Sequence, residues 1–248
     1  LEDGSIWKFA VEDEGGNWAR MSYSALGASQ ISLSPDARQL LIVNQGNGTL
    51  IDPDSGRSLA DVGAIQAAAW DPGSTARLAV CRDDRTLEIM AEGQVTKLTE
   101  QPLMSGDAKL VQLSFFNETW EDPTLPTRQF LLVHSEQADQ GALQFIAIDP
   151  APAMAASHAP ETEEIPLGTR VAVSPTENIL VTGAPGGTVA VWFAAPTHDP
   201  WPQQLFDLEG HRGEHLNCIT YSSDRRTSIT ADTKNRLFAW LSKDPLVG

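Results

Sequence analysis

The sequence predicts an all-β fold of repeated four-stranded sheets, the architecture of a β-propeller. Three observations support this prediction. Short runs of four to seven residues alternate apolar with other side chains, which is the period of a β-strand. Gly, Asn and Asp stand between these runs and suit tight turns. A turn followed by an alternating run recurs from residues 3, 47, 84, 140, 186 and 234. The mean spacing of about 46 residues is close to the length of one propeller blade.

The repeats are built from three recognisable strand patterns, with about four short strands expected in a full unit. The first apolar run ends at Ser-Pro or a similar turn, in residues 31–35, 68–72, 111–117, 171–175 and 219–224. The second run occupies residues 39–43, 77–81, 130–134, 179–183 and 227–231. The third follows a turn, in residues 3–9, 47–50, 84–89, 140–145, 186–192 and 234–240. These runs predict about five to six four-stranded blades, of which the terminal ones are incomplete.

The repeats divide one predicted domain, 1–248, into units. The predicted boundaries are 1–27, 28–64, 65–106, 107–168, 169–210 and 211–248. The first unit holds only a third and a fourth strand, and the last holds only three strands. We expect a piece of a longer propeller; the alternative is that the two ends combine into one composite blade. Incomplete terminal blades would expose apolar faces, so the chain is also expected to self-associate.

Several runs resemble the WD40 repeat family. Residues 187–192 are similar to the third strand of a WD40 repeat, as are residues 3–7 and 237–240. Gly210-His211 resembles the family's Gly-His pair, placed ahead of the run 216–221. The resemblance covers essentially the whole chain, although repeats two to four lack the terminal Trp and no repeat has the Trp-Asp pair. It implies a degenerate WD40-like propeller.

The resemblance also implies a structural polar network within a blade. In the family, His, Ser or Thr, Asp and Trp bond to one another, and here His211, Thr230 and Trp240 stand at suitable places. Lys234 occupies the usual Asp position, so Asp232 is expected to substitute for it. Trp192 is counted with these structural network residues, as a core or blade-packing side chain on its strand.

Composition excludes several classes of protein. With 33 acidic and 17 basic side chains the net charge is −16, which disfavours nucleic acid as a partner. No apolar run approaches the ~20 residues of a membrane span, and no signal peptide is visible. We therefore expect no membrane contact and a cytoplasmic location. The two cysteines, Cys81 and Cys218, are too few for a disulfide framework and are expected to be buried thiols.

Three long connections form the candidate partner-binding surface. By the strand assignment, residues 117–128, 151–166 and 194–204 fall on one face of the propeller. Long loops of this kind are commonly functional. The surface is acidic and carries two tryptophans, with candidate residues Trp120, Glu121, Asp122, Glu163, Glu164 and Trp201. A basic protein or peptide is the partner that this chemistry suits; the alternative is solvated loops whose tryptophans fold back over the blade edges.

The sequence predicts a non-catalytic scaffold or adaptor domain for protein–protein interaction. It contains no nucleophile elbow, phosphate-binding glycine loop or His-Glu-x-x-His motif, so no catalytic residue, cofactor or metal is expected. Two alternatives stay open. One is a propeller enzyme with a central-channel site, such as a hydrolase or a quinone-dependent dehydrogenase. The other is a regulatory or sensor domain attached to a kinase or another effector.

Overall fold

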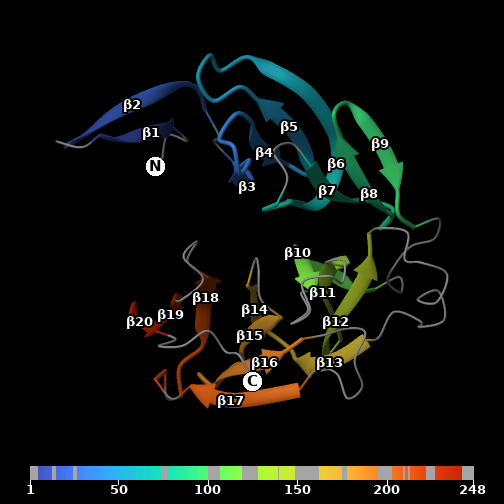
Figure 1. Cartoon of the computed structure of the whole chain (residues 1–248), viewed down its shortest axis with the longest axis vertical. Helices are drawn as coiled ribbons and strands as arrows, with labels where there is room; N and C mark the ends of the chain where they lie inside the picture. The colour runs from blue at the N-terminus through green and yellow to red at the C-terminus, as the bar shows by residue number, and fades with distance from the viewer. Residues whose placement is uncertain are drawn as a thin grey trace. The chain divides into compact units, whose positions relative to one another are not determined.

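The computed structural model confirms the all-β fold class. It describes residues 5–12, 15–24, 27–73, 77–99, 107–118, 128–138, 140–148, 162–174, 178–194, 203–208, 210–211, 213–221 and 227–241. These residues form twenty strands in antiparallel sheets, and none of the described residues is helical (Figure 1). The described residues therefore include no helix that is long and apolar enough to cross a membrane. The chain divides into two compact units, Leu1–Leu103 and Met104–Gly248.

The first unit begins with a two-stranded sheet and continues into a seven-stranded one. The antiparallel pair is β1 (Ser5–Glu12) and β2 (Gly15–Ser24). The larger sheet runs in chain order through β3 (Ala28–Leu33), β4 (Leu40–Asn44), β5 (Asn47–Ile51), β6 (Ser58–Trp70), β7 (Arg77–Arg82), β8 (Leu87–Ala91) and β9 (Gln94–Lys97).

The long strand β6 belongs to two blades. Its first half pairs with β5 up to Ala64, and its second half pairs with β7 from Ile65 onward. Gly63 lies at the change of partner with a φ of 77°, a conformation that glycine adopts without steric cost. β6 is thus the fourth strand of one blade and the first of the next. Apolar side chains of the two blades share one buried cluster that includes Leu41, Ile65 and Val80.

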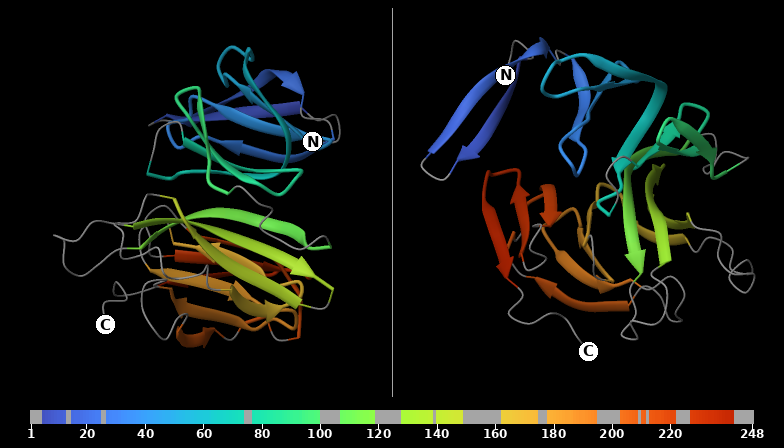
Figure 2. Two further views of the ribbon diagram at one scale, coloured as in Figure 1. Left: turned by 90° about the vertical axis from the view of Figure 1, so that its right-hand side faces the viewer. Right: turned by 45° about the horizontal axis from the view of Figure 1, so that its top comes forward.

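The second unit contains two four-stranded sheets and one three-stranded sheet (Figure 2). The first has β10 (Lys109–Glu118), β11 (Arg128–Gln137), β12 (Gln140–Ala147) and β13 (Thr162–Pro166). The second has β14 (Arg170–Val173), β15 (Ile179–Gly183), β16 (Val189–Phe193) and β17 (Gln203–Leu208). The last has β18 (Leu216–Tyr221), β19 (Thr227–Asp232) and β20 (Leu237–Leu241).

Neighbouring sheets of the second unit pack face to face. The first strands are adjacent, because β14 contacts both β10 and β18. One buried cluster joins β10–β13 to β14–β17 and includes Phe130, Phe145 and Leu180. A second joins β14–β17 to the last sheet and includes Val181 and Leu216. Each sheet therefore buries one face against its neighbour, as propeller blades do.

The strand count confirms the prediction of incomplete terminal blades. The described first sheet has two strands and the described last sheet has three. The repeat boundaries and the single domain stay predictions, and so does the choice between a fragment and a composite blade.

Cys218 corrects the prediction of two buried thiols. Cys81 is buried, but Cys218 is exposed. A β-bulge between Leu216 and Cys218 resets the alternation of β18, so that Ile219 and Tyr221 face the neighbouring sheet. Cys218 consequently points to the opposite side of the strand.

Candidate functional site

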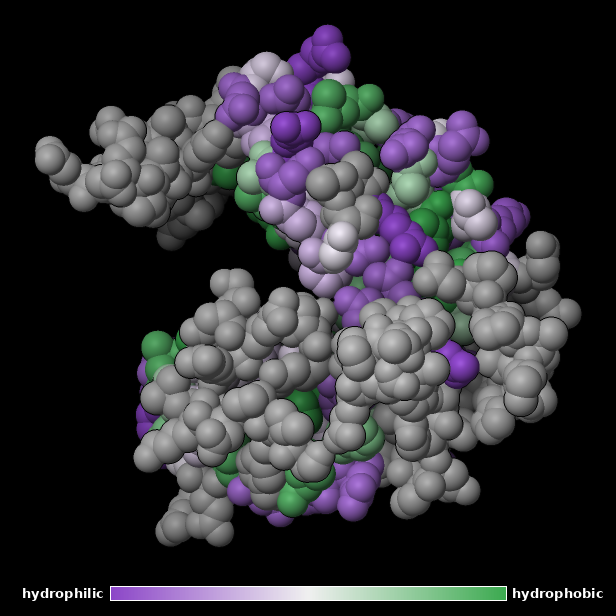
Figure 3. Space-filling view, viewed as in Figure 1, coloured by the Kyte–Doolittle hydropathy of each residue, from purple (hydrophilic) through white to green (hydrophobic). Residues whose placement is uncertain are grey.

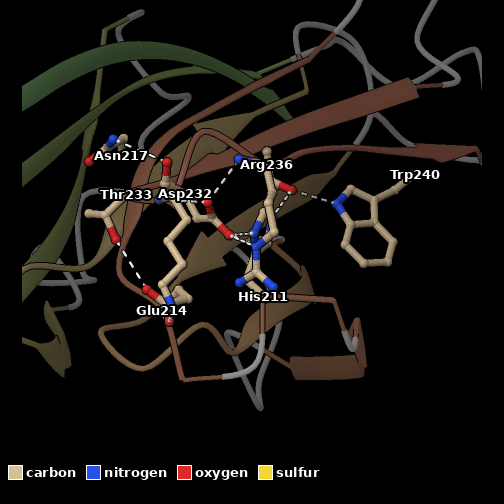
Figure 4. A network of polar contacts seen from close by, with 9 residues as sticks. His211, Glu214, Asn217, Asp232, Thr233, Arg236 and Trp240 are labelled. Atoms are coloured by element: carbon tan, nitrogen blue, oxygen red, sulfur yellow. Dashed lines mark hydrogen bonds and ion pairs between the residues drawn. The ribbon is translucent and has the colours of Figure 1, made fainter.

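A buried polar network ties the last sheet together. His211 lies in the connection before β18, and its Nδ1 is 2.9 Å from Oδ2 of Asp232 at the end of β19. Its Nε2 is 2.6 Å from Oγ1 of Thr230, and Nε1 of Trp240 on β20 donates to the same oxygen at 2.9 Å. Figure 4 shows His211, Asp232 and Trp240 within this network, and its dashed lines mark the contacts. His211, Thr230 and Asp232 are at most 1% exposed.

One assignment of protons satisfies every group in the network. Because the Trp240 N–H can only donate, Oγ1 of Thr230 accepts there and its hydroxyl donates to Nε2 of His211. Nδ1 then carries the imidazole proton and donates to the Asp232 carboxylate. The ring of His211 also packs edge-on against Phe238, with ring centroids 4.5 Å apart. The four polar side chains therefore satisfy one another's hydrogen bonds.

Asp232 also closes the β19–β20 turn. Its Oδ1 accepts from the backbone N–H groups of Lys234 and Arg236, and its Oδ2 accepts from Nε of Arg236 at 2.7 Å. Burial raises the pKa of Asp232, but the hydrogen bonds from His211 and Arg236 outweigh burial and hold the pKa far below its usual range. The carboxylate is thus ionised at neutral pH. Lys234, at the family's usual Asp position, forms an ion pair with Glu214.

The side chains of the network follow one another as in a catalytic triad, but its hydroxyl group is not accessible to a substrate. An acid, an imidazole and a hydroxyl follow one another at hydrogen-bond distance, as a carboxylate, base and nucleophile do in hydrolases. Thr230 and His211 are 0% exposed, however, and the Thr230 hydroxyl is engaged on both sides. No substrate reaches such a hydroxyl without unfolding of the sheet. The arrangement therefore serves as a structural tie.

Half of this network recurs in the sheet β14–β17. Nε1 of Trp192 donates to Oγ1 of Thr182 at 2.7 Å, the counterpart of the Trp240–Thr230 bond. The two pairs have the same register, because Thr182 lies opposite Ala190 and Thr230 opposite Phe238. The structure thus places Trp192 in a polar pair of its own sheet and not with His211.

The close packing around His211 requires glycine in the neighbouring turn. A Cβ at Gly187 would lie 2.1 Å from the carbonyl oxygen of His211, and its φ is +87°. The N–H of Gly213 donates to the carbonyl of Gly186 at 3.0 Å. The turn between β15 and β16 is therefore packed against the connection that carries His211.

The candidate partner-binding residues fall mostly outside the described part of the chain. Trp120, Glu121, Asp122 and Trp201 lie outside the described residues. Glu163 and Glu164 correct the prediction of a loop over 151–166, because residues 162–166 form the edge strand β13. Ile165 anchors this strand in the core while Glu164 is exposed, with Nε2 of Gln140 donating to it at 3.4 Å.

The strand order places the three segments that were predicted as loops at equivalent ends of their sheets. In an antiparallel sheet of consecutive strands, the first-to-second and third-to-fourth connections leave from the same end. Residues 119–127 connect β10 to β11, 149–161 connect β12 to β13, and 195–202 connect β16 to β17. The connection carrying His211 and the turn 184–188 leave from the opposite end of their sheets.

No metal centre is visible in the described part of the chain. None of its groups of three or more His, Cys, Asp or Glu side chains is arranged to hold a metal ion. His215, four residues from His211, precedes β18 and is exposed. A separation of four residues suits two metal ligands on one face of a helix, but His211 and His215 lie on an irregular segment.

Two residues of interest escaped sequence reasoning. His134 on β11 is 1% exposed, and neither of its ring nitrogens has a hydrogen-bond partner. In the sequence it ends an apolar run, Phe130 to Val133, which signals burial of the strand but not the absence of a partner. Gly187 stands in a Gly-Gly pair that reads as an ordinary turn, and only the structure shows the carbonyl that excludes a side chain there.

Comparison with solved structures gives the fold. A chain in the crystal structure of a mitotic checkpoint complex matches 97% of this chain over 85% of its own length, with a TM-score of 0.51 and 13% identity. The Dos1 propeller matches 96% with a TM-score of 0.57 and 13% identity. The chain has a WD40-like β-propeller fold. It spans 59% of the length of the Dos1 propeller.

The likeness lies in structure and not in close sequence similarity. No protein-family model matches this WD40-like chain, and no curated protein sequence matches it significantly. At 13% identity, the two propellers establish the arrangement of strands alone.

Proposed function

We propose that this WD40-like propeller is a non-catalytic scaffold domain that binds another protein or peptide. The observation that carries the proposal is the complete burial of the His211–Asp232–Thr230 network. Residues that would suit catalysis are used to tie strands together, which is the expected use in a rigid platform. A chain of similar fold occurs in a mitotic checkpoint complex, which fits a role in protein assembly.

The proposed binding surface is the sheet end from which residues 119–127, 149–161 and 195–202 depart. Trp120 and Trp201 are the proposed anchors, because tryptophan is favoured at the centre of interfaces. Glu121 and Asp122, which follow Trp120 in the sequence, and the exposed Glu164 are the proposed acidic residues of this surface. With a net charge of −16 in the whole chain, a Lys/Arg-rich peptide is the favoured partner.

Replacement of the connections tests this proposal. A variant with short turns in place of 119–127 and 195–202 should bind a Lys/Arg-rich peptide about tenfold or more weakly, as expected for the loss of an interface anchor. Titration calorimetry at two salt concentrations measures the affinity and its electrostatic part. Asp83→Lys changes an exposed charge at the opposite end of a sheet and is the matched control.

Two outcomes contradict the proposal. Equal affinities of the wild type and the loop-replaced variant would exclude this surface. An unchanged set of partners in quantitative pull-downs with the two proteins would exclude it for natural partners as well.

A further inference from the structure

The outer strands of the blades pair along one side only. They are β2, the first half of β6, β9, β13 and β17, and each has the preceding strand as its partner and no described strand along its other edge. The backbone N–H and C=O groups along such an edge can pair with a strand from another molecule. Figure 1 shows β17 at the outer rim of the second unit.

Among these outer strands, β17 is the one best suited to accept a further strand. β2 and β9 each carry a base, Arg20 and Lys97, and β13 ends at Pro166, whose nitrogen carries no hydrogen. The first half of β6 has two shifts of register, and the N–H of Gly63 is already bonded to the Asp61 side chain. β17 has six residues, no proline, no Lys or Arg and one bulge.

The side chains along β17 are exposed to solvent. Gln203, Gln204 and Asp207 are exposed, and Leu205 is 39% exposed. Leu205 lies at the bulge, where it has no register partner on β16, and bulges re-aim side chains in this way. Figure 3 shows hydrophilic and hydrophobic residues next to one another at the lower rim of the second unit, where β17 lies in Figure 1. An added strand would therefore find one apolar contact within a polar edge.

The charge around β17 favours a basic partner. Between Arg170 at the start of β14 and Arg212, the sequence has no Lys or Arg. The acidic residues in the same stretch are Glu177, Asp199, Asp207 and Glu209. Asp207 is on β17 itself, where Nε2 of Gln204 donates to its carboxylate at 2.8 Å. A Lys or Arg of a partner strand would therefore meet no repelling base on β15–β17.

The start of β17 follows directly on residues 195–202, one of the three connections of the proposed binding surface. We propose that the partner is an extended peptide with Lys or Arg side chains that pairs with the outer edge of β17 as a further strand. This inference rests on the proposed function, because it specifies how that surface holds its partner. Main-chain hydrogen bonds to β17 hold the peptide, Leu205 contacts an apolar side chain of it, and Asp207 pairs with a Lys or Arg.

Hydrogen exchange locates the bound peptide. The probe is an acetylated and amidated peptide of three Lys-Val repeats, which is basic and alternates as a strand does. At a free peptide concentration of about ten times Kd, the β17 amides that join the new ladder should exchange about tenfold more slowly. Mass spectrometry of segments that include residues 203–208 measures this protection, and segments that include β9 and β13 are the internal controls.

Methylation of the peptide backbone separates strand pairing from charge attraction. A probe of the same sequence with every amide nitrogen methylated keeps its side chains and its charge but has no backbone N–H group. It should bind about tenfold or more weakly in titration calorimetry, because it cannot donate to the β17 carbonyl groups. Equal affinities of the two probes would show that charge alone holds the peptide, which overturns the proposal.

A charge on the edge of β17 tests the same contact from the protein side. Leu205→Lys places an ammonium group beside the bound peptide and should weaken the binding of the Lys-Val peptide about tenfold. Val95→Lys makes the same change on β9, where Val95 is 51% exposed, and should leave the affinity unchanged. Circular dichroism checks that both variants are folded. Wild-type affinity of a folded Leu205→Lys variant would refute the proposed contact.

The exchange data also separate strand addition from the proposed function. Binding that is lost when 119–127 and 195–202 are replaced, without protection of 203–208, overturns strand addition and leaves the proposed surface standing. Protection of β9 or β13 in place of β17 overturns strand addition at this edge. A Lys-Val peptide that does not bind the wild type contradicts both proposals.

Discussion

Two buried histidines of the second unit are equally buried but differ in their hydrogen bonds. His211 is 0% exposed and both of its ring nitrogens are hydrogen-bonded, to Asp232 and Thr230. His134 is 1% exposed and neither nitrogen has a partner. Burial lowers the pKa of His134 to about 4, since the nearby Glu136 raises it less and Arg170 lowers it further. A buried imidazole thus stabilises a sheet only where its neighbours supply a donor and an acceptor.

The largest expected effect is that of His211→Leu. Removal of the imidazole takes one buried hydrogen bond from the Asp232 carboxylate and one from the Thr230 hydroxyl. An unmade buried hydrogen bond costs about 1–3 kcal/mol and more at a charged group, so the two together should cost about 3–5 kcal/mol. Urea unfolding followed by circular dichroism should show this loss. His134→Leu is the matched control, and an equal loss in both variants would refute the contrast between the two histidines.

The pH dependence of stability should reveal His134. Its pKa is about 6.5 in the unfolded chain and about 4 in the folded one, so between these values the unfolded state binds more protons. The free energy of unfolding should fall as the pH is lowered from 6.5 to 4, by about 3 kcal/mol in total, and this group adds no change below pH 4. Urea titrations at several pH values measure the slope. A slope that persists in full in His134→Leu would contradict the assignment.

A smaller effect distinguishes the complete network from the Trp192–Thr182 pair. Thr230→Val deprives both His211 and Trp240 of a hydrogen bond, whereas Thr182→Val deprives Trp192 of one. An unsatisfied buried group costs about 1–3 kcal/mol, so Thr230→Val should be more destabilising by about 1–2 kcal/mol. Thermal and urea unfolding of the two isosteric variants provide the comparison, which fails if Thr182→Val costs as much or more.

The smallest effect is a gain in stability. His134→Leu replaces an unpartnered polar ring by an apolar side chain that suits its surroundings, because the adjacent Leu143 and Leu132 belong to the same core. At pH 7.5 the variant should be more stable by about 1 kcal/mol. A substantial loss of stability would show that the imidazole has a partner or a packing role of its own.

The candidate network shows how far sequence reasoning reaches. The resemblance to WD40 repeats predicts that His211, Thr230 and Trp240 share a network, and the structure brings them together. Asp232 is predicted only as a substitute for the family's Asp, since the sequence places Lys234 at that position. Local spacing could not decide between them, because the direction of a turn side chain depends on hydrogen bonds to Lys234 and Arg236.

The sequence by itself determined the all-β fold class and the first three strands of most repeats. These features follow from the period of two along a strand and from turn residues, both of which are local. The tertiary structure decided which buried groups find partners, that Cys218 is exposed and that the edge strand β13 carries Glu164. Bulges reset the alternation, and a side chain's partners come from other strands and neighbouring sheets. His211 and His134 differ in those neighbours, which supply a donor and an acceptor to His211 and no hydrogen-bond partner to His134.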